Sequence, residues 1–329
     1  MSKNSRKKGP TLYDLFHRDP LAGGGISKND TLERNFKNFF RLSWWHIGHI
    51  LSVNMLFIFG NFPFFFGLLA FSGLLNDTLP SPASSVFPSL FGVVQEGYNP
   101  FTAALYGIHG VQGNLSVNTT ATNVMYGLFF LIFITWGFVN TGTTFILRNL
   151  VKGEPVFTLR DFFYSIKRNL LQSFIMGVID LGICLLLCYD IIFFYFNMGT
   201  YVSALMFYVS ILLALIYFVM RFYIYIILIT FNLSIPKIFK NSFIFSALGM
   251  KRNLLALLGI AVVAFIDYYL MILILPLGII LPIIILYGYC AYMGAYAAWP
   301  KIKQYMIDPY KDEEEAKKEE ETVFHDDVT

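Results

Sequence analysis

Long apolar runs recur along the chain and are separated by shorter polar stretches. Each run has about 20 residues or more, the number that a helix needs to cross a hydrocarbon core of roughly 30 Å. None alternates apolar and polar residues as barrel strands do, and lipid requires closed backbone hydrogen bonding, so we expect helices. The pattern predicts an all-α membrane protein with six transmembrane helices at about 47–74, 124–146, 170–196, 201–231, 254–275 and 277–299.

Three of these runs follow a short segment in which large apolar residues occupy one helical face and basic residues the others. The segments contain FKNFF at 36–40, DFFYSIKRNLL at 161–171 and FKNSF at 239–243. Such spacing predicts amphipathic helices that lie at a membrane interface. The first should begin near Asp30, with Glu33 at the capping-box position. We therefore expect three hairpins, each preceded by an interfacial helix, or two such units and an unrelated first hairpin.

The pentapeptide KRNLL occurs twice, at 167–171 and 251–255, each time at the start of a long apolar run. We expect its Lys and Arg to remain at the headgroups while Asn169 and Asn253 cap the helices that follow. The repeat then marks the point at which an interfacial helix turns into a membrane helix.

All 24 Lys and Arg residues fall in four parts of the chain, 1–43, 148–168, 221–252 and 301–318. The alternate connections, 75–123, 197–200 and the turn at Pro276, contain none. Because basic loops stay inside, we expect both termini to be cytoplasmic. The residues that we expect to contact headgroups or a docked protein are Arg148, Asp161, Phe162, Phe163, Lys167, Arg168, Phe239, Lys240, Lys251 and Arg252.

Composition agrees with this organisation, since 56% of the 329 residues are apolar and 14% are charged. We expect a flexible basic arm at 1–29, a membrane domain at 30–308 with an outer connecting loop at 75–123, and a charged cytoplasmic tail at 309–329. A net charge of +3 gives no sign of nucleic-acid binding. The three cysteines lack metal-ligand spacing, and His46 and His49 have no acidic or Cys neighbour, so we expect no metal site or cofactor.

Charged residues inside the apolar runs are the candidate functional groups, because burying an unpaired charge in lipid costs about 2.5–3.5 kcal/mol on insertion scales. Asp180 and Asp267 are either a proton, cation or sugar site, or structural groups bonded to Tyr or Ser on neighbouring helices. Arg221 interrupts the fourth run. We expect it to extend to the inner headgroups; the alternative is that it is buried and paired with an acid.

The stretch TGTTFILRNLVKGEPVFTLRDFFYSIKRNLLQSF, at 141–174, resembles the core of the YesL-like family of bacterial membrane proteins. In that family, a helix ends in small residues and an Arg. A Gly-Glu turn follows it and leads into an amphipathic helix that begins with Asp-Phe-Phe. The region from Arg221 to the second KRNLL resembles the family's second cytoplasmic region. The resemblance implies an association with carbohydrate uptake, because genes of the family commonly lie beside ABC importers. It brings no catalytic residues.

Two functions compete on these grounds. The first is an accessory or regulatory protein of the bacterial cytoplasmic membrane that docks onto the permease subunits of a carbohydrate ABC importer. The second is a transporter or permease subunit with a polar path near Asp180 and Asp267. We do not expect an enzyme, because the sequence has no phosphate loop, no GxSxG and no HExxH.

Overall fold

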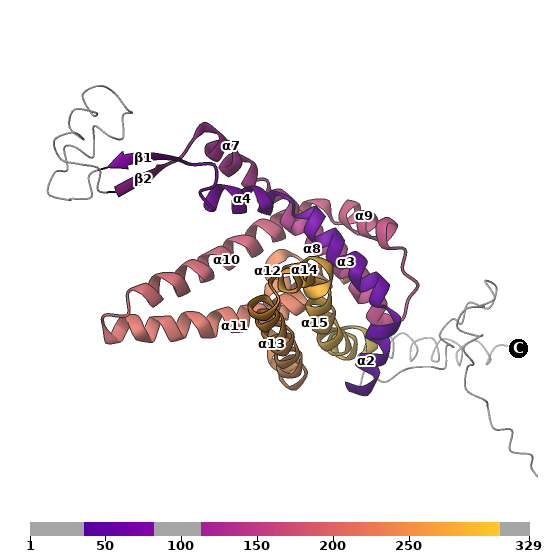
Figure 1. The fold of residues 1–329 in the computed structure, drawn as a ribbon. Coiled ribbons are helices and arrows are strands. Elements are labelled where there is room, and N and C mark those ends of the chain that lie inside the picture. Colours follow the sequence, from indigo (N-terminus) through magenta and orange to yellow (C-terminus); the bar gives the residue numbers. More distant parts are fainter. Residues whose placement is uncertain (1–35, 82–112, 310–329) are drawn as a thin grey trace, which may run out of the picture.

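The computed structural model describes residues 36–81 and 113–309 (Figure 1). The predicted arm at 1–29, the helix start at Asp30, the centre of the 75–123 loop and the tail beyond residue 309 lie outside this part of the chain.

The described chain is almost wholly helical, as the apolar runs predict. Its elements are α2 (Phe36–Trp45), α3 (Ile47–Gly60), α4 (Pro63–Phe71), β1 (Asp77–Ser81), β2 (Gly113–Val117), α7 (Thr120–Phe129), α8 (Ile132–Lys152), α9 (Thr158–Arg168), α10 (Leu170–Phe196), α11 (Tyr201–Thr230), α12 (Ile235–Leu248), α13 (Met250–Leu273), α14 (Leu275–Leu281), the π-helix η1 (Pro282–Leu286), α15 (Tyr287–Ile302) and the π-helix η2 (Lys303–Ile307).

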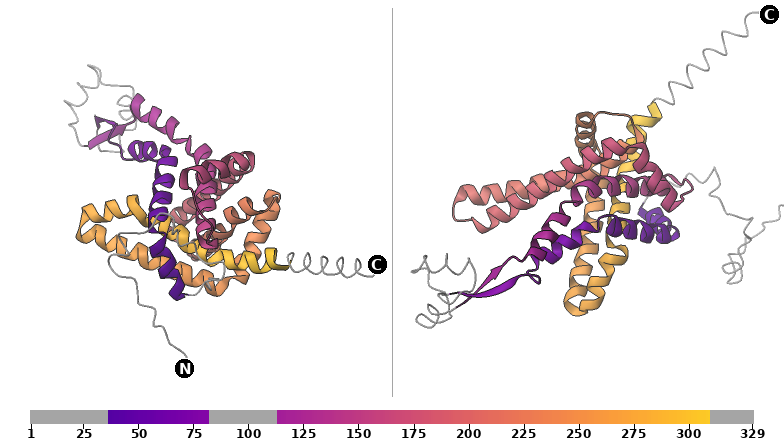
Figure 2. Two further views of the ribbon diagram at one scale, coloured as in Figure 1. Left: turned by 90° about the vertical axis from the view of Figure 1, so that its right-hand side faces the viewer. Right: turned by 90° about the horizontal axis from the view of Figure 1, so that it is seen from above.

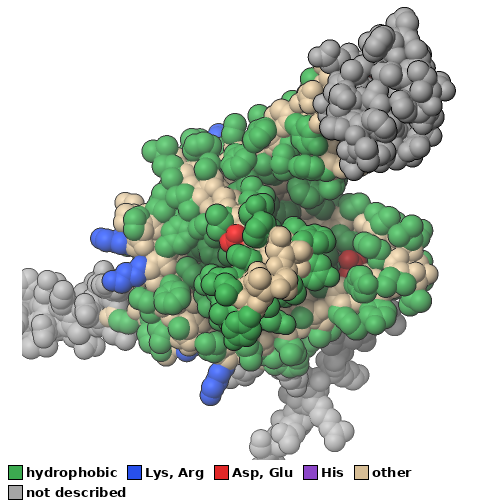
Figure 3. Space-filling view, turned by 90° about the vertical axis from the view of Figure 1, so that its left-hand side faces the viewer, with side chains coloured by type: hydrophobic (Ala, Val, Ile, Leu, Met, Phe, Trp, Pro, Cys, Tyr) green, Lys and Arg blue, Asp and Glu red, His purple; other side chains and the backbone are tan. Residues whose placement is uncertain are grey.

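Five helices or joined helices among the described residues are long and apolar enough to cross a membrane. They are Thr120–Lys152, Leu170–Phe196, Tyr201–Thr230, Met250–Leu273 and Leu275–Ile307. A sixth candidate, Asn38–Trp45 with Ile47–Gly60, is bent by 69°. One face of the molecule is mostly hydrophobic, with acidic side chains occurring singly and Lys and Arg near its edges (Figure 3). These features confirm an all-α membrane protein with several apolar helices.

Two of the predicted runs are broken where proline removes a backbone donor. The first run divides into α3 and α4, and Pro63 occupies the first turn of α4. The break after Ile274 matches the turn predicted at Pro276, and the last run is interrupted at Pro282, where the π-helix η1 begins. Asn54 of α3 crosses to this second break. Its amide donates to the Pro282 and Ile283 carbonyls at 3.2 and 2.6 Å, and its Oδ1 accepts the Gly288 N–H at 2.9 Å.

A short helix directly precedes a longer one at three places: α2 before α3, α9 before α10, and α12 before α13. The expected capping by the KRNLL asparagines is wrong, because neither forms a side-chain cap for the helix that follows. Asn169 donates back to the Ser165 carbonyl at 3.0 Å, and Asn253 to the Ser246 carbonyl at 2.9 Å. Each side chain therefore binds the carbonyl end of the preceding short helix, which lacks intrahelical donors.

Helices α8, α11 and α15 form the centre of the bundle. Most side chains in the C-terminal half of each of these helices are buried. Two long arms extend from this centre in different directions (Figure 2). One consists of α10 and α11 side by side, and in the other α13 packs against α14 and α15.

The segment predicted as an outer connecting loop contains a two-stranded antiparallel sheet, with Asp77 opposite Val117. Polar contacts at its base explain why it forms. Asn76 donates to the Ser116 hydroxyl at 3.0 Å and accepts from Thr122 at 2.8 Å, while Thr119 caps α7. Figure 1 shows the sheet at the same end of the molecule as the turn between α10 and α11.

Helices α8 and α10 approach closely because glycines meet at their crossing, as small residues do in membrane bundles. A Cβ atom on Gly177 would overlap the Gly137 backbone, and one on Gly137 would overlap the Ser173 carbonyl. Gly182, also on α10, has open space around its Cβ position.

Replacing Gly177 by Ala should therefore force α8 and α10 apart and destabilise the protein by roughly 1–3 kcal/mol, the usual cost of overpacking. Gly182→Ala is the matched control on the same helix and should be neutral or slightly stabilising. Thermal unfolding in detergent, followed by size-exclusion chromatography, measures both variants. Equal stability of the two would contradict the crossing.

Candidate functional site

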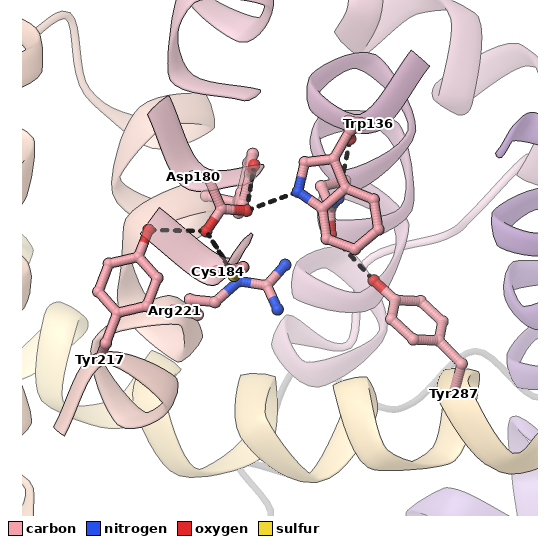
Figure 4. A network of polar contacts seen from close by, with 8 residues as sticks. Trp136, Asp180, Cys184, Tyr217, Arg221 and Tyr287 are labelled. Atoms are coloured by element: carbon pink, nitrogen blue, oxygen red, sulfur yellow. Dashed lines mark hydrogen bonds and ion pairs between the residues drawn. The ribbon is translucent and has the colours of Figure 1, made fainter. Parts of the chain in front are cut away.

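A buried carboxylate lies at the centre of the largest polar network in the described chain. Asp180 is fully buried, eleven residues into α10 and hence about 15 Å from its start. Its Oδ1 accepts the Tyr217 hydroxyl at 2.8 Å, and its Oδ2 accepts the Trp136 Nε1–H at 2.9 Å and the Tyr225 hydroxyl at 2.8 Å. We call these residues, together with Arg221, the Asp180 cluster (Figure 4).

Arg221 supplies the counter-charge. Its Nε lies 3.0 Å from Asp180 Oδ1, as an ion pair without hydrogen-bond alignment, and its guanidinium lies 5.4 Å from the centre of the Trp136 ring. The Arg221 side chain is 20% exposed, whereas that of Asp180 is not exposed at all. The expectation that Arg221 extends to the headgroups is therefore wrong. An ion pair with Asp180 satisfies both charges in an apolar bundle, which neither achieves alone.

Helix geometry explains how three partners reach one carboxylate. Tyr217, Arg221 and Tyr225 are four residues apart along α11, so they share one face of that helix. Trp136 comes from α8, close to the glycine crossing that brings α8 and α10 together. The spacing of four between these residues is visible in the sequence. It identifies a site only when an acid on another helix is known to face them.

A second layer of aromatic and amide groups ties the Asp180 cluster to the rest of the bundle. Tyr287 of α15 donates to Asn140 Oδ1 at 3.1 Å, and the Asn140 amide donates to the Trp136 carbonyl at 2.8 Å (Figure 4). Phe57 of α3 stacks on Tyr287 and meets the edge of Trp136. The network therefore connects α3, α8, α10, α11 and α15.

Asp267 does not join this network in any described contact. It is buried on α13 and 9% exposed, and its Oδ1 has no hydrogen-bond partner among the described residues. Asp180 thus has the tyrosine partners expected of a structural group, whereas Asp267 has none. Within the described residues there is no group of three His, Cys, Asp or Glu side chains able to hold a metal ion.

Three of the residues predicted to contact headgroups or a partner are buried instead. Arg148 donates to Asn149 Oδ1 at 2.8 Å and to the Thr230 hydroxyl at 3.1 Å, which fixes it against the end of α11. Asp161 accepts the Phe157 N–H at 2.8 Å, and Phe162 packs against Gly142. Arg148 and Phe162 hold α11 and α9 onto the bundle, and Asp161 binds the start of its own helix, so the three side chains are unavailable for docking.

The remaining predicted contacts stay at the surface. Phe163, Lys167, Arg168, Lys240 and Lys251 are exposed, and Phe239 and Arg252 are half-buried.

Comparisons with protein-family models, curated proteins and solved structures give no match for this chain. The resemblance to the YesL-like family therefore remains a prediction from the motifs quoted above.

Replacing Asp180 by Asn or Arg221 by Gln should each destabilise the protein by roughly 3–5 kcal/mol, because each leaves a buried charge without its partner. The double variant should lose less than the sum of the two, since it leaves neither charge. Unfolding free energies in detergent measure this coupling. Asp190→Asn on the same helix is the control and should stay within about 0.5 kcal/mol of the parent protein. Additive losses would show that the pair is not coupled.

Proposed function

We propose that this chain is an accessory, non-enzymatic protein of the bacterial cytoplasmic membrane that binds other membrane proteins. The expected partners are permease subunits of a carbohydrate ABC importer, as the YesL-like resemblance implies. The observation that carries the proposal is the saturation of Asp180. Its two carboxylate oxygens already have Arg221 and three hydrogen-bond donors as partners, so its role is to hold the bundle together.

We further propose six membrane spans in three hairpins, with both termini in the cytoplasm. Five candidate spans and the bent pair of α2 and α3 support this number. The sheet and the α10–α11 turn, which belong to connections without Lys or Arg, lie at one end of the molecule (Figure 1). A common extracytoplasmic side accounts for that arrangement through the positive-inside rule.

The proposed docking surface is the outer face of α9. Leu159, Phe163 and Tyr164 are 64%, 55% and 53% exposed, whereas Phe162 and Ser165 on the opposite face are buried. Arg160 and Lys167 flank the exposed aromatics. Large aromatics rimmed by basic residues are typical of contact surfaces, and a helix at the membrane interface presents them to a neighbouring protein.

Affinity purification in mild detergent tests this role. The tagged protein should retain importer permease subunits, and Phe163→Ser should reduce their recovery several-fold because the variant removes an exposed aromatic anchor from α9. Phe71→Ser on α4 is the matched control, since Phe71 is 69% exposed at a distant site. Recovery of the protein alone, or equal loss in both variants, would contradict the proposal.

One observation favours the transporter alternative. Asp267 keeps a buried, unpartnered oxygen on α13, a helix that is followed by the break at Ile274, and transporters use broken helices and buried acids for solute or ion binding.

Flux measurements in liposomes of the purified protein decide between the two functions. We expect no sugar or ion flux above that of empty liposomes, and therefore no difference between the parent protein and Asp267→Asn. Flux that the parent supports and Asp267→Asn abolishes would replace the accessory role with transport.

A further inference from the structure

A cavity of about 520 Å³ lies where α10 begins, α11 ends and α12 begins. Both α10 and α11 are candidate membrane spans, so their shared end places the cavity at a membrane surface. Its lining combines polar side chains, including Arg168, Gln172 and Ser234, with the apolar side chains of Leu170, Leu171 and Ile175.

The polar part of this cavity is basic. Arg168 lines it, is exposed, and forms no side-chain hydrogen bond or ion pair with any residue that the structure describes. No Asp or Glu is among the lining residues. Arg148 lies behind the wall, bonded to Thr230 of the lining, and is close enough to Arg168 for the two positive charges to repel each other. An anion bound at Arg168 would relieve this repulsion.

The carbonyl end of α9, at Arg168, would oppose an anion, and Asn169 donates to the Ser165 carbonyl there at 3.0 Å. The carbonyl end of α11 would oppose an anion too. Its negative partial charge is offset by Arg148, which donates to the Ile229 carbonyl at 3.4 Å, and Gln172 donates to the Leu233 carbonyl at 2.5 Å. The start of α12 also faces the cavity, and its first residue, Ile235, offers a backbone N–H group, because Ser234 forms no side-chain cap there. The next residue, Pro236, has no N–H to offer.

We propose that this cavity binds the phosphate group of an anionic phospholipid, with the phosphate at Arg168 and an acyl chain along Leu170, Leu171 and Ile175. A lipid rather than free phosphate fits because these three apolar side chains are exposed and continue from the cavity along α10. Basic pockets between membrane helices are suited to anionic headgroups. The site does not depend on the protein partner proposed above.

The second KRNLL shows why the first is the better candidate. Its arginine, Arg252, lines an apolar cavity of about 550 Å³ between α2, α13 and α15. There Arg252 already donates to the Tyr296 carbonyl at 3.2 Å and lies 6.0 Å from the Tyr296 ring. In the first copy of the pentapeptide the Arg168 guanidinium is therefore open to a ligand. In the second copy the Arg252 guanidinium is bonded within the protein.

Native mass spectrometry of the purified full chain with dioleoyl phosphatidylglycerol tests the site. The parent protein should retain at least one phosphatidylglycerol in preference to phosphatidylcholine. Arg168→Gln should weaken that binding roughly fivefold, as expected for the loss of one basic contact. Ile175→Trp, which fills the cavity without changing charge, should also weaken it.

Lys167→Gln is the matched control, because Lys167 is the exposed neighbour of Arg168 in the same pentapeptide but does not line the cavity. It should bind the lipid nearly as the parent does. Equal losses in Arg168→Gln and Lys167→Gln would overturn the site as a general surface effect. Equal retention of phosphatidylcholine, or full displacement by inorganic phosphate at millimolar concentration, would overturn an anionic lipid as the occupant.

Discussion

The ion pair between Asp180 and Arg221 is the interaction on which the arrangement of the bundle depends. A charged carboxylate in the middle of an apolar helix is stabilised when its charge is balanced and both oxygens have donors. Here those donors come from α8 and α11. Their contacts with one carboxylate on α10 fix how α8, α10 and α11 are positioned along one another. The glycine crossing of α8 and α10 and the stacking of Phe57 on Tyr287 then fix α3 and α15 around the same point.

This constraint also distinguishes the surroundings of the two buried acids. Asp180 has partners for both oxygens, and such a group has no free site for a moving ion or solute. Asp267 keeps an oxygen without a partner on a helix that contributes little to the centre of the bundle. The two positions look alike in sequence because each is an acid within an apolar run. Their surroundings differ because different helices lie beside them. The apolar pattern of a single run does not predict which helices will be its neighbours.

The lengths of the apolar runs predicted both ends of α10 and predicted the ends of α11 to within one residue, because neither run contains a proline. The same rule missed the break at Asn61, where proline follows within two residues and ends the helical hydrogen bonding. It placed the turn at Pro276, close to the observed break at Ile274. Side-chain partners were harder to predict. Arg221 was expected at the headgroups because about twenty apolar residues precede it, and only a three-dimensional neighbour, Asp180, explains why it turns inward. Trp136, Tyr217 and Tyr225 were missed for the same reason.

Asn54 has a consequence for the order in which the protein assembles. Its amide binds carbonyls that lie 228 and 229 residues later in the chain, at the π-helix before α15. Because synthesis proceeds from the N-terminus, α3 is made long before these acceptors exist. Until then the amide has no native partner, and α3 lacks α15, whose Gly288 packs against Ile50 and Asn54. Helix α3 therefore reaches its final position only after α15 is made.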